Sequence, residues 1–236
     1  MPLSSRSVSP LLVAALIASF TACGREEIKY KPRPAPKSQI TLPPVANVPQ
    51  TPLKRGDVYT VWGASYSLRS RVLHKDIADK PMTLEGYIVD TNLMEAPECA
   101  VHKGGKADPE NCKPPVPTFW LGDDKSASRK DCIRVMGWAS NYAQIFDAIK
   151  ELDEKGIEKA EPKDTFWGKD IPKPLPAKGA KVRVTGPYST VFVGASTGPE
   201  ADPIMGIITY TKIETLEEAP ELATLPGVER KPKKDK

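Results

Sequence analysis

The sequence predicts a mainly β domain: a small closed barrel of five strands, with one helix between the third and fourth strands and an additional strand before them. Residues 132–152 have the pattern of a short strand that leads directly into an amphipathic helix. Segments with the apolar alternation of β-strands lie on both sides of that helix. Gly86 interrupts one of them, and a bulge or sharp bend at such a glycine lets a small sheet close on itself.

The helix is expected over residues 140–152. Its apolar side chains recur at one face with helical period, at Tyr142, Ile145, Phe146, Ile149 and Leu152. Ser140 or Asn141 can cap its first turn, and Gln144 makes the start similar to a capping box. Gly156 can end the helix in the left-handed conformation. We therefore expect a core-facing helix that plugs one end of the barrel.

The strands are expected between long loops. Before the helix they lie at residues 57–66, 81–91, 118–121 and 132–138, and after it at 181–186, 188–193 and 206–216. Residues 92–117 form a long polar loop, and loops of that length are usually functional or held by a cross-link. Residues 157–176 predict a loop laid over the barrel, and residues 194–205 a loop between the last two strands.

This order of strands and helix resembles the OB-fold, a five-stranded Greek-key barrel with its helix after the third strand. The resemblance covers residues 81–216 and is carried by residues 83–88, 119–121, 133–137, the helix, 181–186 and 207–216. It implies a topology and no particular chemistry. The segment 57–66 would be an addition to the barrel, and a β-sandwich is the structural alternative.

The start of the chain predicts export. Residues 1–22 contain Arg6 and then an apolar run at 11–20, which is too short for a helix that spans a bilayer of about 30 Å. Phe20-Thr21-Ala22-Cys23 resembles the bacterial lipobox, although the lipobox usually has Leu where Phe20 stands. The resemblance implies that Cys23 is acylated and becomes the first mature residue, and Gly24 after it favours the outer membrane, facing the periplasm or the cell surface. An ordinary secretory signal with an incidental cysteine is the alternative.

The rest of the chain divides into a tether, a domain and a tail. Residues 23–56 are rich in proline, which favours an extended tether and excludes a helix. Residues 57–216 form the domain, and residues 217–236 are expected to be a disordered basic tail. The formal net charge of +4 is spread along the chain, so the sequence does not predict nucleic-acid binding. The expected contact with the membrane is the lipid anchor.

The cysteines leave two possibilities open. With Cys23 acylated, an odd number remains, and a Cys99–Cys112 disulfide would close the long loop and leave Cys132 as a buried thiol. Alternatively, Cys99, His102, Cys112 and Cys132 could supply three sulfurs and one imidazole to zinc or cuprous copper. The second possibility would make the chain a metal-binding lipoprotein.

The sequence contains no combination of residues that is typical of a catalytic site. We therefore expect that the protein is not an enzyme and binds no cofactor. Residues 194–198 spell G-x-S-x-G, but the prolines that follow are incompatible with the helix that such a serine nucleophile requires. Asp123 and Asp124 are neighbours in a turn and are not expected to act as an acid–base pair.

Binding is therefore the expected function. In OB-folds the ligand face is formed by the second and third strands and the loops beside them, here residues 119–121, 133–138, 92–117 and 194–205. Aromatic side chains near that face could stack on a ligand, namely Tyr87, Trp120, Trp138 and Tyr188. The alternative is that most of them belong to the core. The sequence favours a lipid-anchored envelope module that binds a protein or a glycan.

Overall fold

The computed structural model describes residues 51–195 and 198–230. The expected signal segment, Cys23 and most of the expected tether lie outside the described residues. Within the two described ranges, none of the helices combines the length and the apolar character that a crossing of a bilayer requires.

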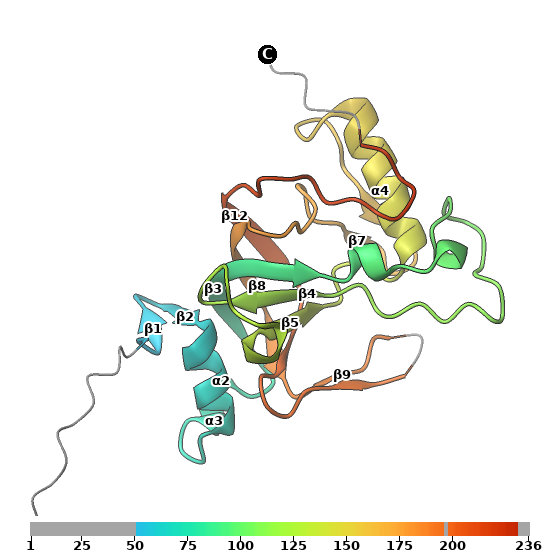
Figure 1. Cartoon of the computed structure of the whole chain (residues 1–236). Helices are drawn as coiled ribbons and strands as arrows, with labels where there is room; N and C mark the ends of the chain where they lie inside the picture. Colours follow the sequence, from blue (N-terminus) through green and yellow to red (C-terminus); the bar gives the residue numbers. More distant parts are fainter. Residues whose placement is uncertain (1–50, 196–197, 231–236) are drawn as a thin grey trace, which may run out of the picture. The chain divides into compact units, whose positions relative to one another are not determined.

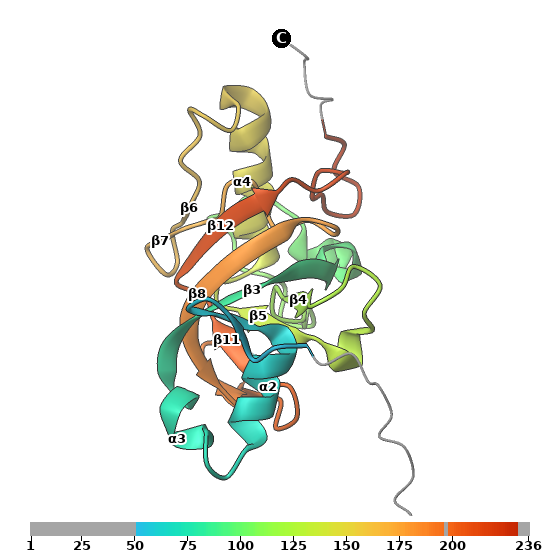
Figure 2. The ribbon, with the colours of Figure 1, turned by 90° about the vertical axis from the view of Figure 1, so that its left-hand side faces the viewer.

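Five strands pair in a closed ring, and the curled sheet that they form is seen in Figures 1 and 2. They are β3 (Lys80–Thr91), β4 (Phe119–Gly122), β5 (Ile133–Met136), β8 (Lys181–Ser189) and β11 (Ile207–Thr209). Strand β3 pairs antiparallel with both β4 and β8, β4 with β5, and β8 with β11, while β5 and β11 run parallel and complete the ring. The helix α4 (Tyr142–Lys155) lies between the third and fourth of these strands. This is the OB-fold topology, and the β-sandwich alternative is wrong.

The strands of the barrel alternate in burial as expected. Along β8, buried Val182, Val184, Gly186 and Tyr188 alternate with partly exposed residues. The inward side chains of β3, β4 and β5 join the same core, including Leu84, Leu121 and Ile133. Burial of each such aliphatic side chain stabilises the fold by about 1.5 to 3 kcal/mol.

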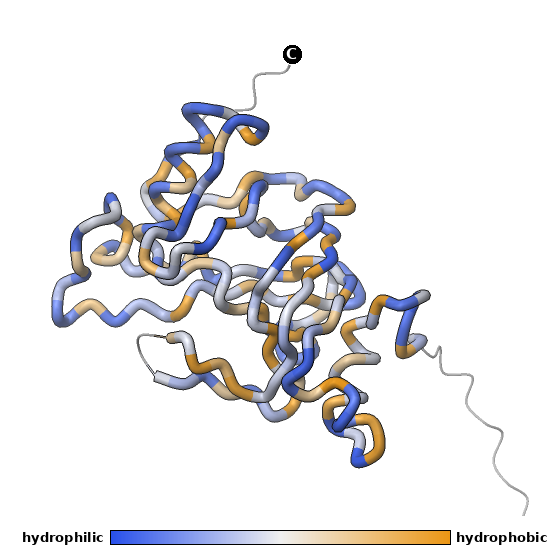
Figure 3. The backbone as a smooth tube through the Cα atoms, turned by 180° about the vertical axis from the view of Figure 1, so that it is seen from behind, coloured by the Kyte–Doolittle hydropathy of each residue, from blue (hydrophilic) through white to orange (hydrophobic). Residues whose placement is uncertain are grey.

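Helix α4 is capped at the predicted residues, but it runs over Tyr142–Lys155 rather than the predicted 140–152. Asn141 caps it by accepting a hydrogen bond from the backbone N–H of Gln144 at 3.0 Å, and Gly156 ends it with φ of 79°. The capping box is only half formed, because the Gln144 side chain accepts bonds from Thr165 instead. Hydrophobic and hydrophilic residues alternate along the helix in Figure 3. Its buried stripe joins the barrel core, whereas Phe146 is only partly buried.

The segment 57–66 is not the single strand that its alternation predicts. Residues Val58–Thr60 form β2, which pairs with β3 and, on its other side, with β1 (Lys54–Arg55), but α2 then runs over Val61–Arg69. The reason is capping: Thr60 accepts a bond from Gly63, and the distant Asp123 carboxylate accepts from the N–H groups of Val61 and Trp62 at 2.9 and 2.7 Å. A tertiary contact therefore overrides the local strand pattern.

Helices α2 and α4 lie at opposite ends of the barrel (Figure 1). Helix α4 follows the end of β5, and its Tyr142 hydroxyl donates to the carbonyl of Asn92 just after β3. Leu68 of α2 instead packs where β8 ends and β11 begins, so closely that a Cβ added to Gly206 would lie 2.7 Å from it. The expected plug by α4 is present, and α2 is a second plug that the alternation did not predict. The short helix α3 (His74–Ile77) follows α2.

Gly86 is required for a different reason from the predicted bulge. The pairing of β3 with β8 runs regularly through Gly86, and the irregularity of β3 lies between Ile88 and Asp90 in its pairing with β4. A Cβ on Gly86 would come within 2.8 Å of the Gly122 carbonyl oxygen and 3.0 Å of Val61. Glycine therefore allows β4 and α2 to approach β3 closely.

The expected loops carry short strands. Residues 157–176 contain the hairpin of β6 (Lys163–Asp164) and β7 (Lys169–Asp170), and a second hairpin, β9 (Val191–Phe192) with β10 (Glu200–Ala201), precedes β11. The last strand, β12 (Lys212–Glu217), pairs with β8.

The predicted boundaries of the domain are too narrow. At its start, the carbonyl of Leu53 accepts a hydrogen bond from the N–H of Thr60, so folded structure begins before residue 57. After β12, Ala223 and Leu225 are buried in the core, and Arg230 forms an ion pair with Asp153 at 2.9 Å. The expectation of a disordered tail from residue 217 is therefore wrong as far as Arg230.

Candidate binding surface on the outer face of the barrel

A row of polar and aromatic side chains crosses the outer face of three barrel strands. Asp90 of β3 is paired across the sheet with Trp120 of β4, which in turn is paired with Arg134 of β5. The residues on either side of Trp120 and Arg134 point into the core, namely Phe119, Leu121, Ile133 and Val135. Because side chains alternate along a strand, Trp120 and Arg134 share the outer face.

Trp120 is covered on one ring face by an arginine that is itself held in place. The Arg129 guanidinium lies 4.3 Å from the centroid of the Trp120 ring, a cation–π distance. Its Nε donates to Asp90 at 2.7 Å and its Nη2 donates to Glu95 at 2.5 Å. The two carboxylates fix the guanidinium against the ring, so the pair is organised in advance of any contact.

Arg134 ties the β9–β10 hairpin to the same face. Its side chain is only 18% exposed and lies within 3.2 Å of the Glu200 carboxylate and 3.5 Å of the Asp202 carboxylate. A small apolar cluster beside it joins the hairpin and the long loop to the barrel, namely Val116, Met136, Phe192 and Ile207. The hairpin therefore covers the β5–β11 part of the OB-fold ligand face, and the Trp120 part stays open.

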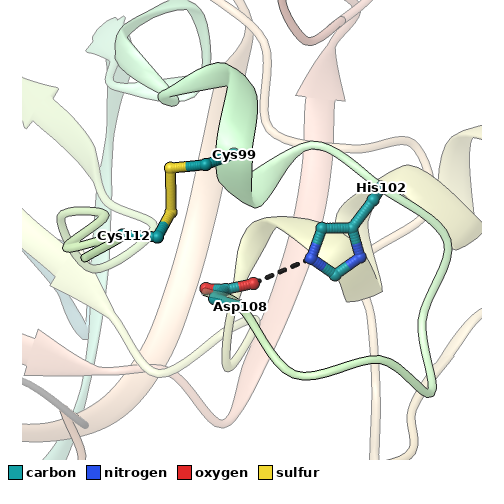
Figure 4. Close-up of a disulfide and its surroundings, with 4 residues drawn as sticks. All are labelled: Cys99, His102, Asp108 and Cys112. Carbon is teal, nitrogen blue, oxygen red and sulfur yellow. Dashed lines mark hydrogen bonds and ion pairs between the residues drawn. A yellow bond between two sulfur atoms is a disulfide. The ribbon is translucent and has the colours of Figure 1, made fainter. Parts of the chain in front are cut away.

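The long loop beside this face is fixed by a disulfide. Cys99 and Cys112 are bonded (Figure 4), so the predicted cross-link is confirmed. At the base of the loop, the Asn92 side chain donates to the carbonyl of Val116 and accepts from the N–H of Thr118. Further along, the N–H of Gly104 donates to Asp147 of α4 at 3.0 Å.

His102 adds a charged contact within the loop. Its Nε2 lies 2.9 Å from the Asp108 carboxylate (Figure 4), and its Nδ1 lies 2.9 Å from the carbonyl oxygen of Lys103. Both ring nitrogens face acceptors, so both bonds form only when the imidazole is protonated. The Lys103 carbonyl and the Asp108 carboxylate together raise the pKa of His102 above its ordinary value, despite the opposing effect of burial.

The metal-site alternative is wrong. Cys99 and Cys112 are bonded to each other, and His102 faces Asp108. Cys132 is buried, its thiol donates to the carbonyl of Ser128, and burial raises its pKa to about 11. A thiol with that pKa supplies little thiolate for a metal or for nucleophilic chemistry. In the described parts of the chain, no group of three or more His, Cys, Asp or Glu side chains is placed to hold a metal ion.

Two of the four candidate aromatic residues are not on the surface. Trp138 and Tyr188 are buried, with exposed fractions of 1% and 0%, so both belong to the core and neither can stack on a ligand. Tyr87 and Trp120 are partly exposed. The amino groups of Lys125 and Lys181 lie 4.9 and 5.7 Å from the Tyr87 ring. Only Trp120 lies in the row that crosses the ligand face.

Sequence reasoning missed the two arginines of this surface. Arg134 could have been found, because it alternates with Ile133 and Val135 and must point outward from a strand. Arg129 could not, because it lies in a polar turn and meets Asp90 and Glu95 only in the folded chain.

Ser196 of the G-x-S-x-G motif lies outside the described residues. No protein-family model matches the sequence, and no curated protein matches it significantly.

Proposed function

We propose that this chain is a non-catalytic binding module of the bacterial cell envelope. It is held at the outer membrane by lipid on Cys23, and it binds a protein partner through the open part of the OB-fold ligand face. The observation that supports this most directly is the Trp120–Arg129 pair, which two carboxylates hold against the outer face of the barrel.

A protein partner suits this surface better than a glycan. Trp and Arg are the side chains that most often dominate the binding energy of protein interfaces. Because Asp90 and Glu95 already hold Arg129, little side-chain freedom is lost on association. A sugar ring stacks on an open aromatic face, whereas one face of Trp120 is already covered by the guanidinium.

The loop beside the pair supports the same proposal. An interface loop that is ordered before binding costs less to immobilise than a free one. Residues 92–118 are held by the Cys99–Cys112 disulfide, the His102–Asp108 ion pair and the bond from Gly104 to Asp147. The loop therefore offers a fixed wall next to Trp120.

The lipid anchor rests on the lipobox resemblance, and it has a separate test. Mass spectrometry of the mature protein from its native host should give a mass that starts at Cys23 and includes acyl chains. The Cys23→Ser variant should lose both the acyl mass and the membrane association. A mature protein without acyl chains would contradict the anchor and leave the binding proposal untouched.

The partner can be identified by cross-linking in intact cells. A photoreactive residue at exposed Met94, beside Glu95, should give a discrete adduct, whereas the same residue at exposed Lys155, at the end of α4, should not. Protease and glycosidase treatment of the adduct then separates a protein partner from a glycan. An adduct that survives protease but not glycosidase would contradict the protein proposal.

Affinity for the captured partner then tests the proposed surface. Trp120→Ala should weaken binding about 30-fold, the loss of about 2 kcal/mol that defines an interface hot spot. Trp62→Ala is the matched control, because Trp62 is 42% exposed and lies on α2 at the other end of the barrel from α4. Equal effects of the two variants, or no effect of Trp120→Ala, would exclude the proposed face.

A further inference from the structure

A cavity of about 270 Å³ lies between the barrel, α4 and the segment that follows β12. One wall is the inward side of the sheet, where Ile88, Val182 and Ile213 line it. The C-terminal end of α4 contributes Leu152, and the chain after it contributes Ile157. The cavity shares no lining residue with the Trp120 surface, so it is independent of the proposed partner site.

The segment 218–223 forms the roof of the cavity. It is anchored on one side by β12 and on the other by Arg230, which donates to Asp153 at 2.9 Å and to the carbonyl of Ala223 at 2.6 Å. Arg230 and Asp153 are 14% and 11% exposed, so this ion pair is largely shielded from water. The roof is therefore built into the fold.

The walls resist collapse. Pro174, Pro176 and Pro220 line the cavity, and proline fixes its backbone φ. Pro220 also lies directly against Gly179, where an added Cβ would be 2.9 Å from its ring. A partly open apolar pocket with such stiff walls is a preformed site.

We infer that this cavity binds a small uncharged apolar molecule, of about the size of a bicyclic aromatic. An apolar cavity of about 150 Å³ holds benzene, so a volume of about 270 Å³ suits a molecule almost twice as large. Most lining side chains are apolar. The charged lining residues are Arg230, which is already paired with Asp153, and Glu218 and Glu221, whose negative charges disfavour an anion. An anionic ligand would therefore lose its hydration without gaining a counter-ion.

Two matched probes test this inference by NMR of methyl-labelled protein. Naphthalene should produce saturable shifts of the methyl signals of Ile88, Val182 and Ile213. Naphthalene-2-carboxylate has the same rings with a negative charge, and it should bind at least tenfold more weakly. Absence of saturable shifts with naphthalene, or equal binding of the carboxylate, would overturn the inference.

A filled cavity provides the second test. Ala219 of the roof lines the cavity, so Ala219→Phe should fill it and reduce naphthalene binding at least tenfold. Ala107→Phe makes the same change at an exposed position and should bind as the wild type does. Unchanged binding by a folded Ala219→Phe variant would place the naphthalene elsewhere and contradict the site. If that variant does not fold, the wild-type shifts with the two probes still decide the question.

Discussion

At the scale of single residues, Glu85 shows how a charge stabilises the seam of the barrel. Its carboxylate is 12% exposed and bridges two cations of β8, Lys181 at 3.1 Å and Arg183 at 3.0 Å. Burial alone would raise the pKa of Glu85, but the two cationic donors outweigh it, so the pKa lies below its ordinary value. The β3–β8 pairing therefore contains a pH-dependent contact.

Replacement of Glu85 by Gln tests this contact. A folded pKa below the unfolded pKa means that the stabilisation is present above the unfolded pKa and is lost as pH falls through the folded pKa. We expect Glu85→Gln to lower the free energy of unfolding by about 1 to 3 kcal/mol at pH 7 and by much less at acid pH. Urea unfolding at the two pH values measures both. Glu214→Gln is the control, because Glu214 is 59% exposed and lies 4.0 Å from Arg183; an equal loss there would contradict a specific role for Glu85.

At the scale of elements, the conformations of two segments are fixed by contacts between residues that are not neighbours in the sequence. The long loop after β3 is closed by the Cys99–Cys112 bond, which joins residues separated by 13 positions. Helix α2 is capped locally by Thr60 and also by Asp123, which follows β4 directly and accepts hydrogen bonds from its first N–H groups. Each contact fixes a segment of weak local preference, which is the loop beside the proposed binding surface in one case and the barrel end in the other.

The disulfide should contribute about 3 kcal/mol, from the restriction of a loop of about 14 residues in the unfolded chain. The double variant Cys99→Ser/Cys112→Ser should lower the free energy of unfolding by that amount. It should also increase backbone amide exchange in the loop between the two cysteines. Denaturant unfolding and hydrogen exchange measure the two effects. Unchanged exchange in the loop would mean that the polar contacts hold it without the bond.

The role of Asp123 as a cap of α2 can be tested against its neighbour Asp124, which does not contact the helix start. Asp123→Ala removes the acceptor for the N–H groups of Val61 and Trp62, and we expect a loss of about 1 to 2 kcal/mol in the free energy of unfolding. Asp124→Ala should cost less, because the Asp124 carboxylate bonds to Ser126 within an exposed turn. Thermal unfolding of both variants distinguishes them, and similar losses would show that the helix start does not depend on Asp123.

At the scale of the whole domain, the segment after β12 belongs to the folded structure. Leu225 is 1% exposed, and Arg230 forms an ion pair with Asp153 of α4. The C-terminal segment therefore joins α2 and α4 among the elements that lie outside the ring of strands, and it covers the apolar cavity. None of these three elements covers the outer face at Trp120.

Truncation of one buried side chain tests the role of this segment. Leu225→Ala should lower the free energy of unfolding by about 2 to 3 kcal/mol, within the range for a large-to-small change in a core. Leu222→Ala should have a smaller effect, because Leu222 is 37% exposed. Denaturant unfolding of the two variants gives the comparison. Equal losses would mean that the segment packs less specifically than its burial indicates.

The parts of the fold that depend on local sequence were predictable. The α4 stripe, its Asn141 cap, the Gly156 end and the alternation of β8 all follow from periods and caps that a short segment carries by itself. The disulfide was one of two open possibilities. The sequence could not place Trp138 and Tyr188 in the core or on the binding face, because an aromatic side chain suits both. Their burial depends on which neighbours the folded barrel brings around them.

The sequence by itself determined the class of the domain, the order of its strands around the helix and the expectation of a lipid-anchored start. Those features are set by local periodicity and by short contiguous motifs. Only the tertiary structure decided that residues 61–69 form a helix, that Arg129 covers Trp120, and that the chain after β12 closes a cavity. Each of these depends at least in part on groups that are distant in sequence and meet only once the barrel has closed, as Asp123 does at the start of α2.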